Sequence, residues 1–206
     1  MVWLLAALIG ASVLSSCTGT KYNYVASTST GTFFKVPGNW RVYGQPQILA
    51  HENAIDPAAA SRPNFPFFVI LDGDPAPSLD HDVTVAQFPF GLARVRHLSV
   101  DEHDNFSLAS LRNEVVNVDQ LASSNANAVN VVRPTKLLVH GGLRGSQLEF
   151  TVHASATNSF TVDQVGFVDA PTRTVWLLII GCSTACYKAN AASIHRIVDS
   201  WTVRAK

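Results

Sequence analysis

A short acidic segment, residues 72–82, carries the clearest potential for chemistry. It places five possible oxygen or nitrogen ligands within eleven positions: Asp72, Asp74, Asp80, His81 and Asp82. Carboxylate oxygens are the ligands that Ca²⁺ prefers, so calcium would suit this acidic loop. An EF-hand, however, needs Asp at alternate positions, Gly at the sixth and Glu at the twelfth, and Pro75 and Pro77 break that order. We therefore expect a solvated loop that follows a strand, with a metal site as the alternative.

A glycine-rich segment and the histidines are two further patterns that bear on catalysis. The segment 141–146, Gly-Gly-Leu-Arg-Gly-Ser, lacks the endings of phosphate-binding and nucleophile loops, so it predicts a hairpin turn. The seven histidines are spread along the chain: His51, His81, His97, His103, His140, His153 and His195. His140 and His153 could face each other across the glycine hairpin, but a single pair is a weak basis for acid-base or metal chemistry. We expect no catalytic residue, no metal and no cofactor.

The N-terminus indicates where the protein is located. An uncharged apolar run of about 13 residues ends in Leu14-Ser15-Ser16-Cys17, and it is shorter than the roughly 20 residues of a membrane-spanning helix. This ending resembles the bacterial lipobox, which implies cleavage after residue 16 and a diacylglyceryl thioether on Cys17. The resemblance places the mature protein at the extracytoplasmic face of the cell membrane. No Lys or Arg precedes Trp3, unlike a normal signal peptide, so the alternatives are a start further upstream or a buried N-terminal helix.

Cysteine usage agrees with an exported protein. Once Cys17 is assigned to the lipid, Cys182 and Cys186 remain as a neighbouring pair, which an oxidising compartment would join in a disulfide. The loop it closes is short, so we expect a stabilisation of only about 2 kcal/mol. A zinc site is the alternative, although no second pair of ligands with zinc spacing accompanies the two thiols.

Composition limits the size and the partners of the folded part. The chain has 206 residues, with 15 Lys and Arg against 15 Asp and Glu, and it shows no basic cluster. Nucleic acid is therefore not expected as a partner. The 47% of hydrophobic residues indicates a globular chain. We predict a flexible tether over 17–31, rich in Ser, Thr and Gly, and a single domain over 32–206.

Apolar periodicity predicts the elements of this domain. Strands are expected at 32–36 and 40–43, joined as a β-hairpin by Pro37-Gly38-Asn39, followed by a short helix near 46–53. Further strands are expected at 67–71 and 92–99. Apolar residues at Leu108, Leu111, Val115 and Val118 predict one helix after the acidic residues 101–104.

From residue 130 onward the period changes to two. It predicts an antiparallel meander of strands at 131–140, 143–155, 159–168 and 174–181, then a helix through 187–198 and a closing strand at 201–203. Strands in runs, with helices at intervals, indicate the α+β class: an antiparallel β-sheet with helices packed on it.

Both ends of the domain resemble a known family. Residues 33–40, Phe-Phe-Lys-Val-Pro-Gly-Asn-Trp, resemble the aromatic Pro-x-x-Trp segment that opens PsbP-like domains. Residues 175–203 resemble the strand, helix and short strand that close them. This is the fold of a photosystem II extrinsic subunit and of actinobacterial lipoproteins of the LpqN type. The resemblance implies a fold and supplies no catalytic residues.

The expected function follows from these points. We expect a non-enzymatic binding module of the cell envelope that is held to the membrane by its lipid anchor. Its partner would be an envelope or host protein or a small envelope ligand. The alternatives are a metal-dependent or hydrolytic envelope enzyme that uses the acidic loop, and a small-ligand carrier with an internal pocket.

Overall fold

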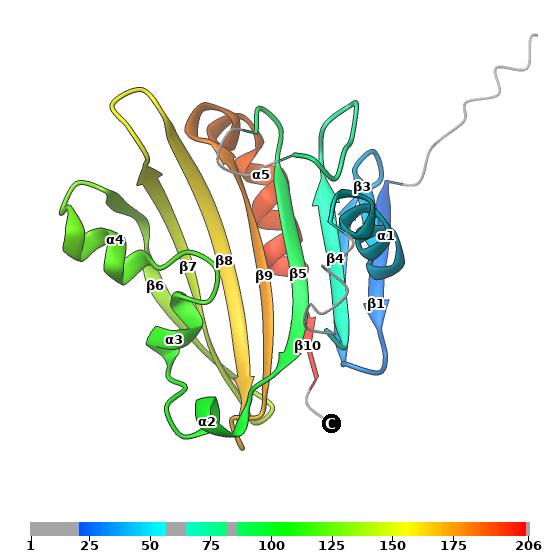
Figure 1. Ribbon diagram of the computed structural model, residues 1–206, viewed down its shortest axis with the longest axis vertical. Coiled ribbons are helices and arrows are strands. Elements are labelled where there is room, and N and C mark those ends of the chain that lie inside the picture. Colours follow the sequence, from blue (N-terminus) through cyan, green and yellow to red (C-terminus); the bar gives the residue numbers. More distant parts are fainter. Residues whose placement is uncertain (1–20, 57–64, 82–85, 205–206) are drawn as a thin grey trace, which may run out of the picture.

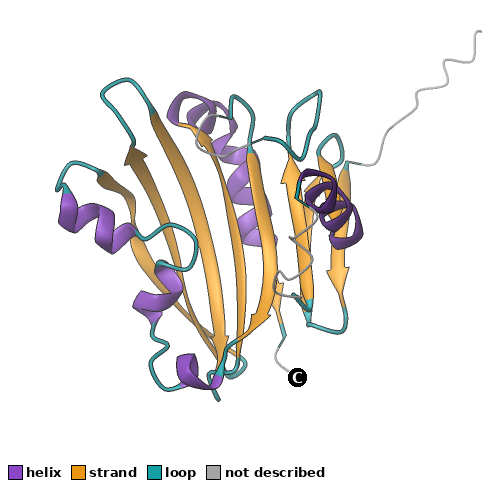
Figure 2. Cartoon of the chain, in the orientation of Figure 1, coloured by secondary structure: helices purple, strands orange, loops and turns teal. Residues whose placement is uncertain are grey.

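The chain folds into two antiparallel sheets with helices on them, as seen in the computed structural model, which describes residues 21–56, 65–81 and 86–204 (Figures 1 and 2). One sheet has three strands in the order β1-β2-β10, and the other has seven in the order β3-β4-β5-β9-β8-β7-β6. The α+β class predicted from the sequence is confirmed. None of the helices in the described ranges is long and apolar enough to span a bilayer.

The strands are β1 (Tyr22–Ser27), β2 (Thr32–Pro37), β3 (Arg41–Gly44), β4 (Phe67–Asp72), β5 (Phe90–His97), β6 (Val129–His140), β7 (Leu143–His153), β8 (Ser159–Asp169), β9 (Thr174–Ser183) and β10 (Thr202–Val203). The helices are α1 (Gln45–Ile55), α2 (Val100–His103), α3 (Leu108–Arg112), α4 (Val118–Ser124) and α5 (Thr184–Ser200). The meander, α1, the last helix and the closing strand all lie where the sequence predicts them.

In the meander β6–β9, the strands β7, β8 and β9 are largely buried on both faces, whereas β6 is the exposed edge strand. The first turn of the meander is Gly141-Gly142, where both glycines have positive φ angles of 55° and 79°, a conformation that side chains disfavour. From there, β7 and β8 pair without interruption from Leu143 opposite Asp169 to His153 opposite Ser159. Successive side chains therefore point alternately to the face that α5 covers and to the face that carries α3 and α4 (Figure 1).

The main core lies on the face of the large sheet that α5 covers. Ile194 and Ile197 of α5 are fully buried and belong to one apolar cluster with Val36 of β2 and Leu178 of β9. Trp176 of β9 also donates its indole N–H to the carbonyl of Thr30, 2.8 Å away. The small sheet and the large sheet thus share one core.

The predicted hairpin at 32–43 is wrong. Strand β2 pairs with β1 and β10, whereas β3 pairs with β4 in the other sheet. The intervening turn does form, since Trp40 donates its backbone N–H to the carbonyl of Pro37 at 3.0 Å. It redirects the chain from one sheet to the other, and it leaves Val36 and Trp40 in the same core.

A flexible tether was predicted over 17–31. This prediction is wrong for residues 21–31, the part of the segment that the structure describes. Tyr22–Ser27 is a strand that pairs with β2 over its whole length, from Tyr22 opposite Pro37 to Ser27 opposite Thr32. Its Ser and Thr residues continue into the turn, where the hydroxyl of Thr30 donates to that of Ser27 at 2.7 Å. Polar composition indicated flexibility here, but pairing with β2 supplies the order. Residues 17–20 and the signal segment 1–16 lie outside the described residues.

The single helix predicted from Leu108 to Val118 is also wrong, because the chain forms the short helices α3 and α4 instead. Asn113 is the C-cap of α3, and Asn117 is the N-cap of α4, with its side chain accepting from the backbone N–H of Gln120. Asparagine favours such caps over helix interiors. The break lets residues 113–117 lie over the sheet.

Candidate functional site

The acidic loop is organised around one buried carboxylate. Asp72 is 1% exposed and accepts from the backbone N–H groups of Asp74 at 2.9 Å and Ser78 at 2.8 Å. Nδ1 of His81 lies 2.8 Å from the same carboxylate, and Asp80 pairs with His51 at 3.0 Å. Asp82 lies outside the described residues. Asp72 therefore serves the loop's own backbone, which favours the interpretation as a structural, solvated loop.

The predicted disulfide is confirmed. Sγ of Cys182, at the end of β9, is bonded to Sγ of Cys186 in the first turn of α5, at 2.06 Å. Both residues are buried. The bond fixes α5 to the strand that precedes it, and it leaves neither sulfur available to zinc. Cys17, the predicted lipid site, lies outside the described residues.

The histidine pair across the glycine hairpin is not formed. His140 is opposite Leu143 beside the turn, whereas His153 is at the far end of β7, opposite Ser159. The two imidazoles thus belong to opposite ends of the sheet.

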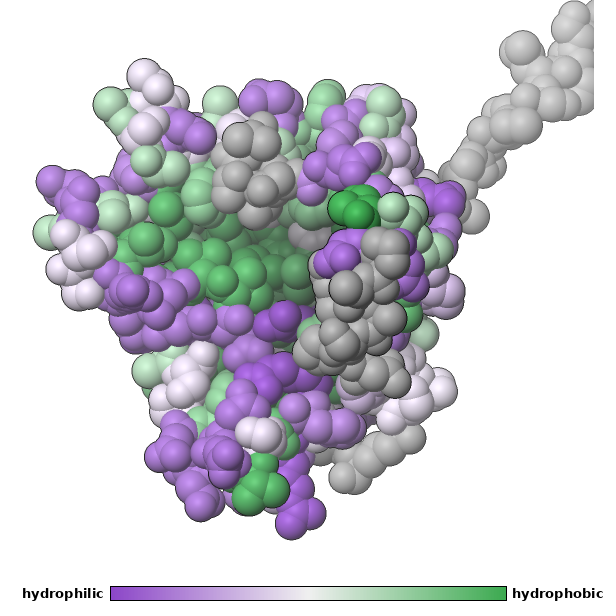
Figure 3. Space-filling view, in the orientation of Figure 1, coloured by the Kyte–Doolittle hydropathy of each residue, from purple (hydrophilic) through white to green (hydrophobic). Residues whose placement is uncertain are grey.

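An apolar hollow lies on the face of the large sheet that carries α3 and α4. Figure 3 shows hydrophobic side chains gathered in a depression over the middle of this face. The apolar cluster here contains Phe150 of β7, Val162 of β8 and Ile179 of β9, with Leu92 of β5 partly buried beside them. Val116 and Leu121 close it on the side of α4. We call these six residues the apolar hollow.

A polar network holds residues 113–117 at the border of this hollow. Glu114 accepts from Arg94 at 3.0 Å and also pairs with Arg96, and its side chain is 7% exposed. The amide of Gln164 on β8 donates to the carbonyls of Leu111 and Arg112, at 3.1 and 3.0 Å. Because these bonds reach from the sheet to the α3–α4 connection, they fix the position of Val116.

The network also perturbs the titration of its members. Hydrogen bonds from Arg96 and from the backbone of Ser99 lower the pKa of Glu102 to about 2. Burial lowers the pKa of Arg94, which Glu114 partly offsets. Arg94 and Arg96 share one face of β5, as the sequence indicated, and the structure shows that Glu114 is their common partner.

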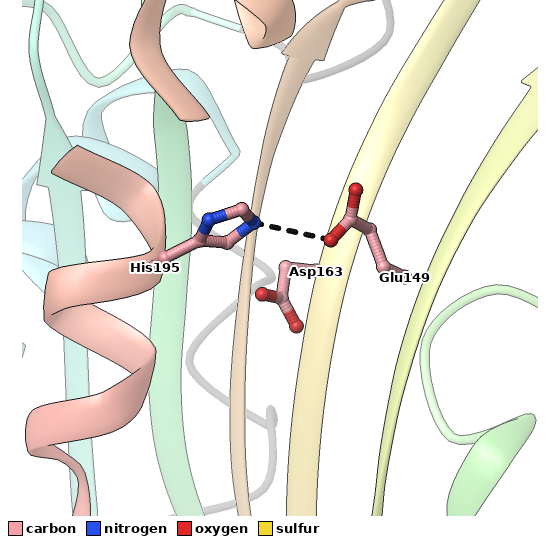
Figure 4. A group of neighbouring side chains, drawn as sticks. All are labelled: Glu149, Asp163 and His195. Carbon is pink, nitrogen blue, oxygen red and sulfur yellow. Dashed lines mark hydrogen bonds and ion pairs between the residues drawn. The ribbon is translucent and has the colours of Figure 1, made fainter. Parts of the chain in front are cut away.

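A second group of functional side chains lies on the opposite face, between the sheet and α5. His195 of α5 points toward Glu149 of β7, with Asp163 of β8 beside them (Figure 4). Nε2 of His195 is 3.1 Å from Oε2 of Glu149, and the ligand atoms of all three residues lie within 4.8 Å of one another. Glu149 is 5% exposed and Asp163 is fully buried. Burial raises the pKa of Asp163 to about 6, despite a hydrogen bond from Gln147.

The sequence does not predict this group, because His195 is one of seven scattered histidines and neither carboxylate belongs to a recognisable motif. The available signal was the position of each carboxylate in the middle of a predicted strand, with Glu149 between Leu148 and Phe150 and Asp163 next to Val162, where a charged residue is uncommon. Their proximity to each other and to His195 depends on strand register and on the docking of α5.

An open pocket of about 560 Å³ lies at a third place, where the β1–β2 turn approaches the end of β5. Its lining includes His97, Trp176 and Arg204. A small-ligand carrier, one of the alternatives from the sequence, would need an internal pocket. This pocket is open to solvent and so meets that expectation only in part.

Comparison with known proteins supports the fold. No protein-family model and no curated protein matches the sequence. The solution structure of a cyanobacterial PsbP from Synechocystis is similar with a TM-score of 0.53 and 10% identity, over 92% of this chain and 98% of that one. The crystal structure of LpqN from Mycobacterium tuberculosis, described as involved in cell envelope biogenesis, aligns with a TM-score of 0.48 and 14% identity, over 89% and 91% of the two chains.

The chain therefore has a PsbP-like fold, and the resemblance noted at both ends of the domain is confirmed at this level. The structural alignment with the cyanobacterial PsbP covers nearly the whole of both chains. It therefore extends beyond the two ends of the domain, where the sequence motifs of the family were found.

Proposed function

We propose that this protein is a lipid-anchored, extracytoplasmic binding module that holds an apolar ligand in the apolar hollow. The observation that carries the proposal is the hollow itself, a depression of hydrophobic side chains (Figure 3) whose partly exposed members are Leu92, Val116 and Leu121. Apolar concave surfaces of this kind mark binding sites, because burying them against a partner removes apolar area from water.

The proposed location rests on two separate observations. The segment that ends at Cys17 has the pattern of a lipid attachment site, and the Cys182–Cys186 disulfide is typical of proteins outside the cytoplasm. The envelope role described for LpqN is compatible with this location.

A fatty acyl chain is the ligand that best fits the hollow and the location. The hollow offers apolar contacts from the partly buried side chains of Leu92, Val116 and Leu121, and a protein anchored at a bilayer surface has acyl chains beside it. Each buried methylene contributes about 0.8 kcal/mol, so a few carbons in the hollow suffice for measurable affinity.

We expect Val116→Glu to weaken binding of a fluorescent fatty acid at least tenfold, because a carboxylate at the rim of the hollow must be desolvated when the acyl chain enters. Titration of the purified chain with the probe measures the dissociation constant. Val116 is only partly buried, so the variant is expected to remain folded.

Val100→Glu is the matched control, since Val100 is 88% exposed on α2 and outside the hollow. Equal affinity in the two variants would contradict the proposal. Loss of binding on His97→Ala alone, with Val116→Glu unaffected, would move the ligand to the pocket that the exposed His97 lines.

Replacement of Cys17 tests the anchor. Cys17→Ser is expected to abolish the acyl mass on the protein and to stop cleavage of the signal segment, because no thiol is left to receive the lipid. Stable attachment needs about two acyl chains, so wild-type protein should partition with membranes after the signal is removed. Mass spectrometry of protein purified from its own membranes gives the result directly, and a wild-type chain without acyl mass would refute the anchor.

A further inference from the structure

We propose that Glu149, Asp163 and His195 form a binding site for a divalent transition-metal ion, with Zn²⁺ as its probe. The site lies on the α5 face of the large sheet, opposite the apolar hollow, and does not depend on the proposed ligand. It is also separate from the acidic loop, which was the metal candidate in the sequence.

The ligand set fits such an ion. Two carboxylates and one imidazole are typical of zinc and of other first-row divalent ions, whereas Ca²⁺ prefers oxygen ligands alone. Nε2 of His195 and Oε2 of Glu149 are 3.1 Å apart, a separation that two ligands of one ion can have. All three ligand atoms lie within 4.8 Å of one another, so modest side-chain rotations would bring them to a common centre.

Strand register holds the two carboxylates together. Glu149 and Asp163 are directly opposite each other in the β7–β8 pair, and both are buried under α5. Like charges at such positions are destabilising, and the low dielectric of a buried site increases the repulsion. A divalent ion between them would convert this repulsion into attraction.

The surrounding protein groups compensate the two charges only in part. Nε of Arg133 lies 3.0 Å from Glu149, but the partners of Asp163 found in the described residues are limited to the amide of Gln147, at 3.2 and 3.4 Å. Asp163 is thus a fully buried carboxylate that faces a histidine and a second carboxylate with one neutral donor.

Arg133 provides a route into the site. Its side chain is 57% exposed, and it sits on β6 between two irregularities of the β6–β7 pairing. An incoming cation would compete with this guanidinium for Glu149, and the long, exposed side chain can withdraw to solvent. A water molecule would complete the coordination.

Calorimetric titration with Zn²⁺ tests the site, using the full chain with Cys17→Ser so that no free thiol competes for the metal. Asp163→Asn and His195→Gln are each expected to weaken binding at least tenfold, as loss of a ligand requires. Arg133→Gln is expected to tighten binding, because it removes the competing charge without removing a ligand. This opposite sign distinguishes a metal site from a purely structural cluster.

His153→Gln is the matched control, because it removes an exposed imidazole from the same strand as Glu149. Unchanged affinity in Asp163→Asn and His195→Gln would show that the ion binds elsewhere and would overturn the proposal. Absence of any heat or melting-temperature rise with millimolar Zn²⁺ in the wild type would overturn it equally. Circular dichroism of each variant confirms that the fold is intact, and Asp163→Asn, which removes a buried charge, is expected to retain it.

Discussion

Gly91→Ala is expected to lower the free energy of unfolding by about 3 kcal/mol, at the upper end of the cost of overpacking. Gly91 lies in β5 and pairs with Leu71 on one side and Ile180 on the other. A methyl group there would meet the carbonyl oxygen of Ile179 and the Cα of Ile180, closer than van der Waals contact permits. These are backbone atoms of the neighbouring strand, so no side-chain rotation relieves the contact, and β5 must move away from β9.

Urea denaturation of the purified chain measures this loss. Gly44→Ala is the matched control, because an added methyl group at Gly44 meets only Cδ of Pro46, at 3.8 Å. Gly44 is the N-cap of α1, where Ala costs about 1 kcal/mol or less relative to Gly. Equal losses in the two variants would mean that the close approach of β5 and β9 has no energetic effect.

Glu114→Ala is expected to cost about 3–5 kcal/mol, because it leaves the guanidinium groups of Arg94 and Arg96 without their shared partner. Their side chains are 20% and 19% exposed, so water replaces the lost carboxylate only in part. The variant should also weaken ligand binding, since Glu114 holds the segment that carries Val116 at the hollow.

Glu102→Gln is the matched control for Glu114→Ala. Glu102 pairs with the same Arg96 at 2.9 Å, but its side chain is 41% exposed. Exposed ion pairs contribute about 0–1 kcal/mol, so the control is expected to lose no more than that. Thermal melts of both variants provide the comparison, and a larger loss in Glu102→Gln than in Glu114→Ala would contradict the assignment of Glu114 as the main partner.

The sequence predicted the strands of the meander because their pattern is local. In β8 and β9 the alternation of side chains between two faces, together with the turns at Asn158 and 170–172, indicates where each strand starts and ends. The pairing of β2 could not be predicted in the same way. Its partners β1 and β10 come from opposite ends of the described chain, and the nearby strand β3 joined the other sheet.

The two candidate sites differ in what the sequence could show. The acidic loop was visible because its residues are close in the chain, yet Asp72 binds the loop's own backbone. Glu149, Asp163 and His195 are far apart in sequence, and only the register of β7 with β8 and the docking of α5 bring them together. The apolar hollow was equally hidden, because four of its residues lie on four separate strands and the other two, Val116 and Leu121, lie at α4.

The short strand β10 has a consequence for how the protein folds. Thr202 and Val203 pair with Phe33 and Thr32, and the backbone N–H of Arg204 donates to the carbonyl of Gly31 at 2.9 Å. These partners come from opposite ends of the described chain, so this edge of β2 stays unpaired until β10 docks against it. Contacts so distant in sequence carry a large loop-closure entropy, which makes the closure of the small sheet a late step of folding.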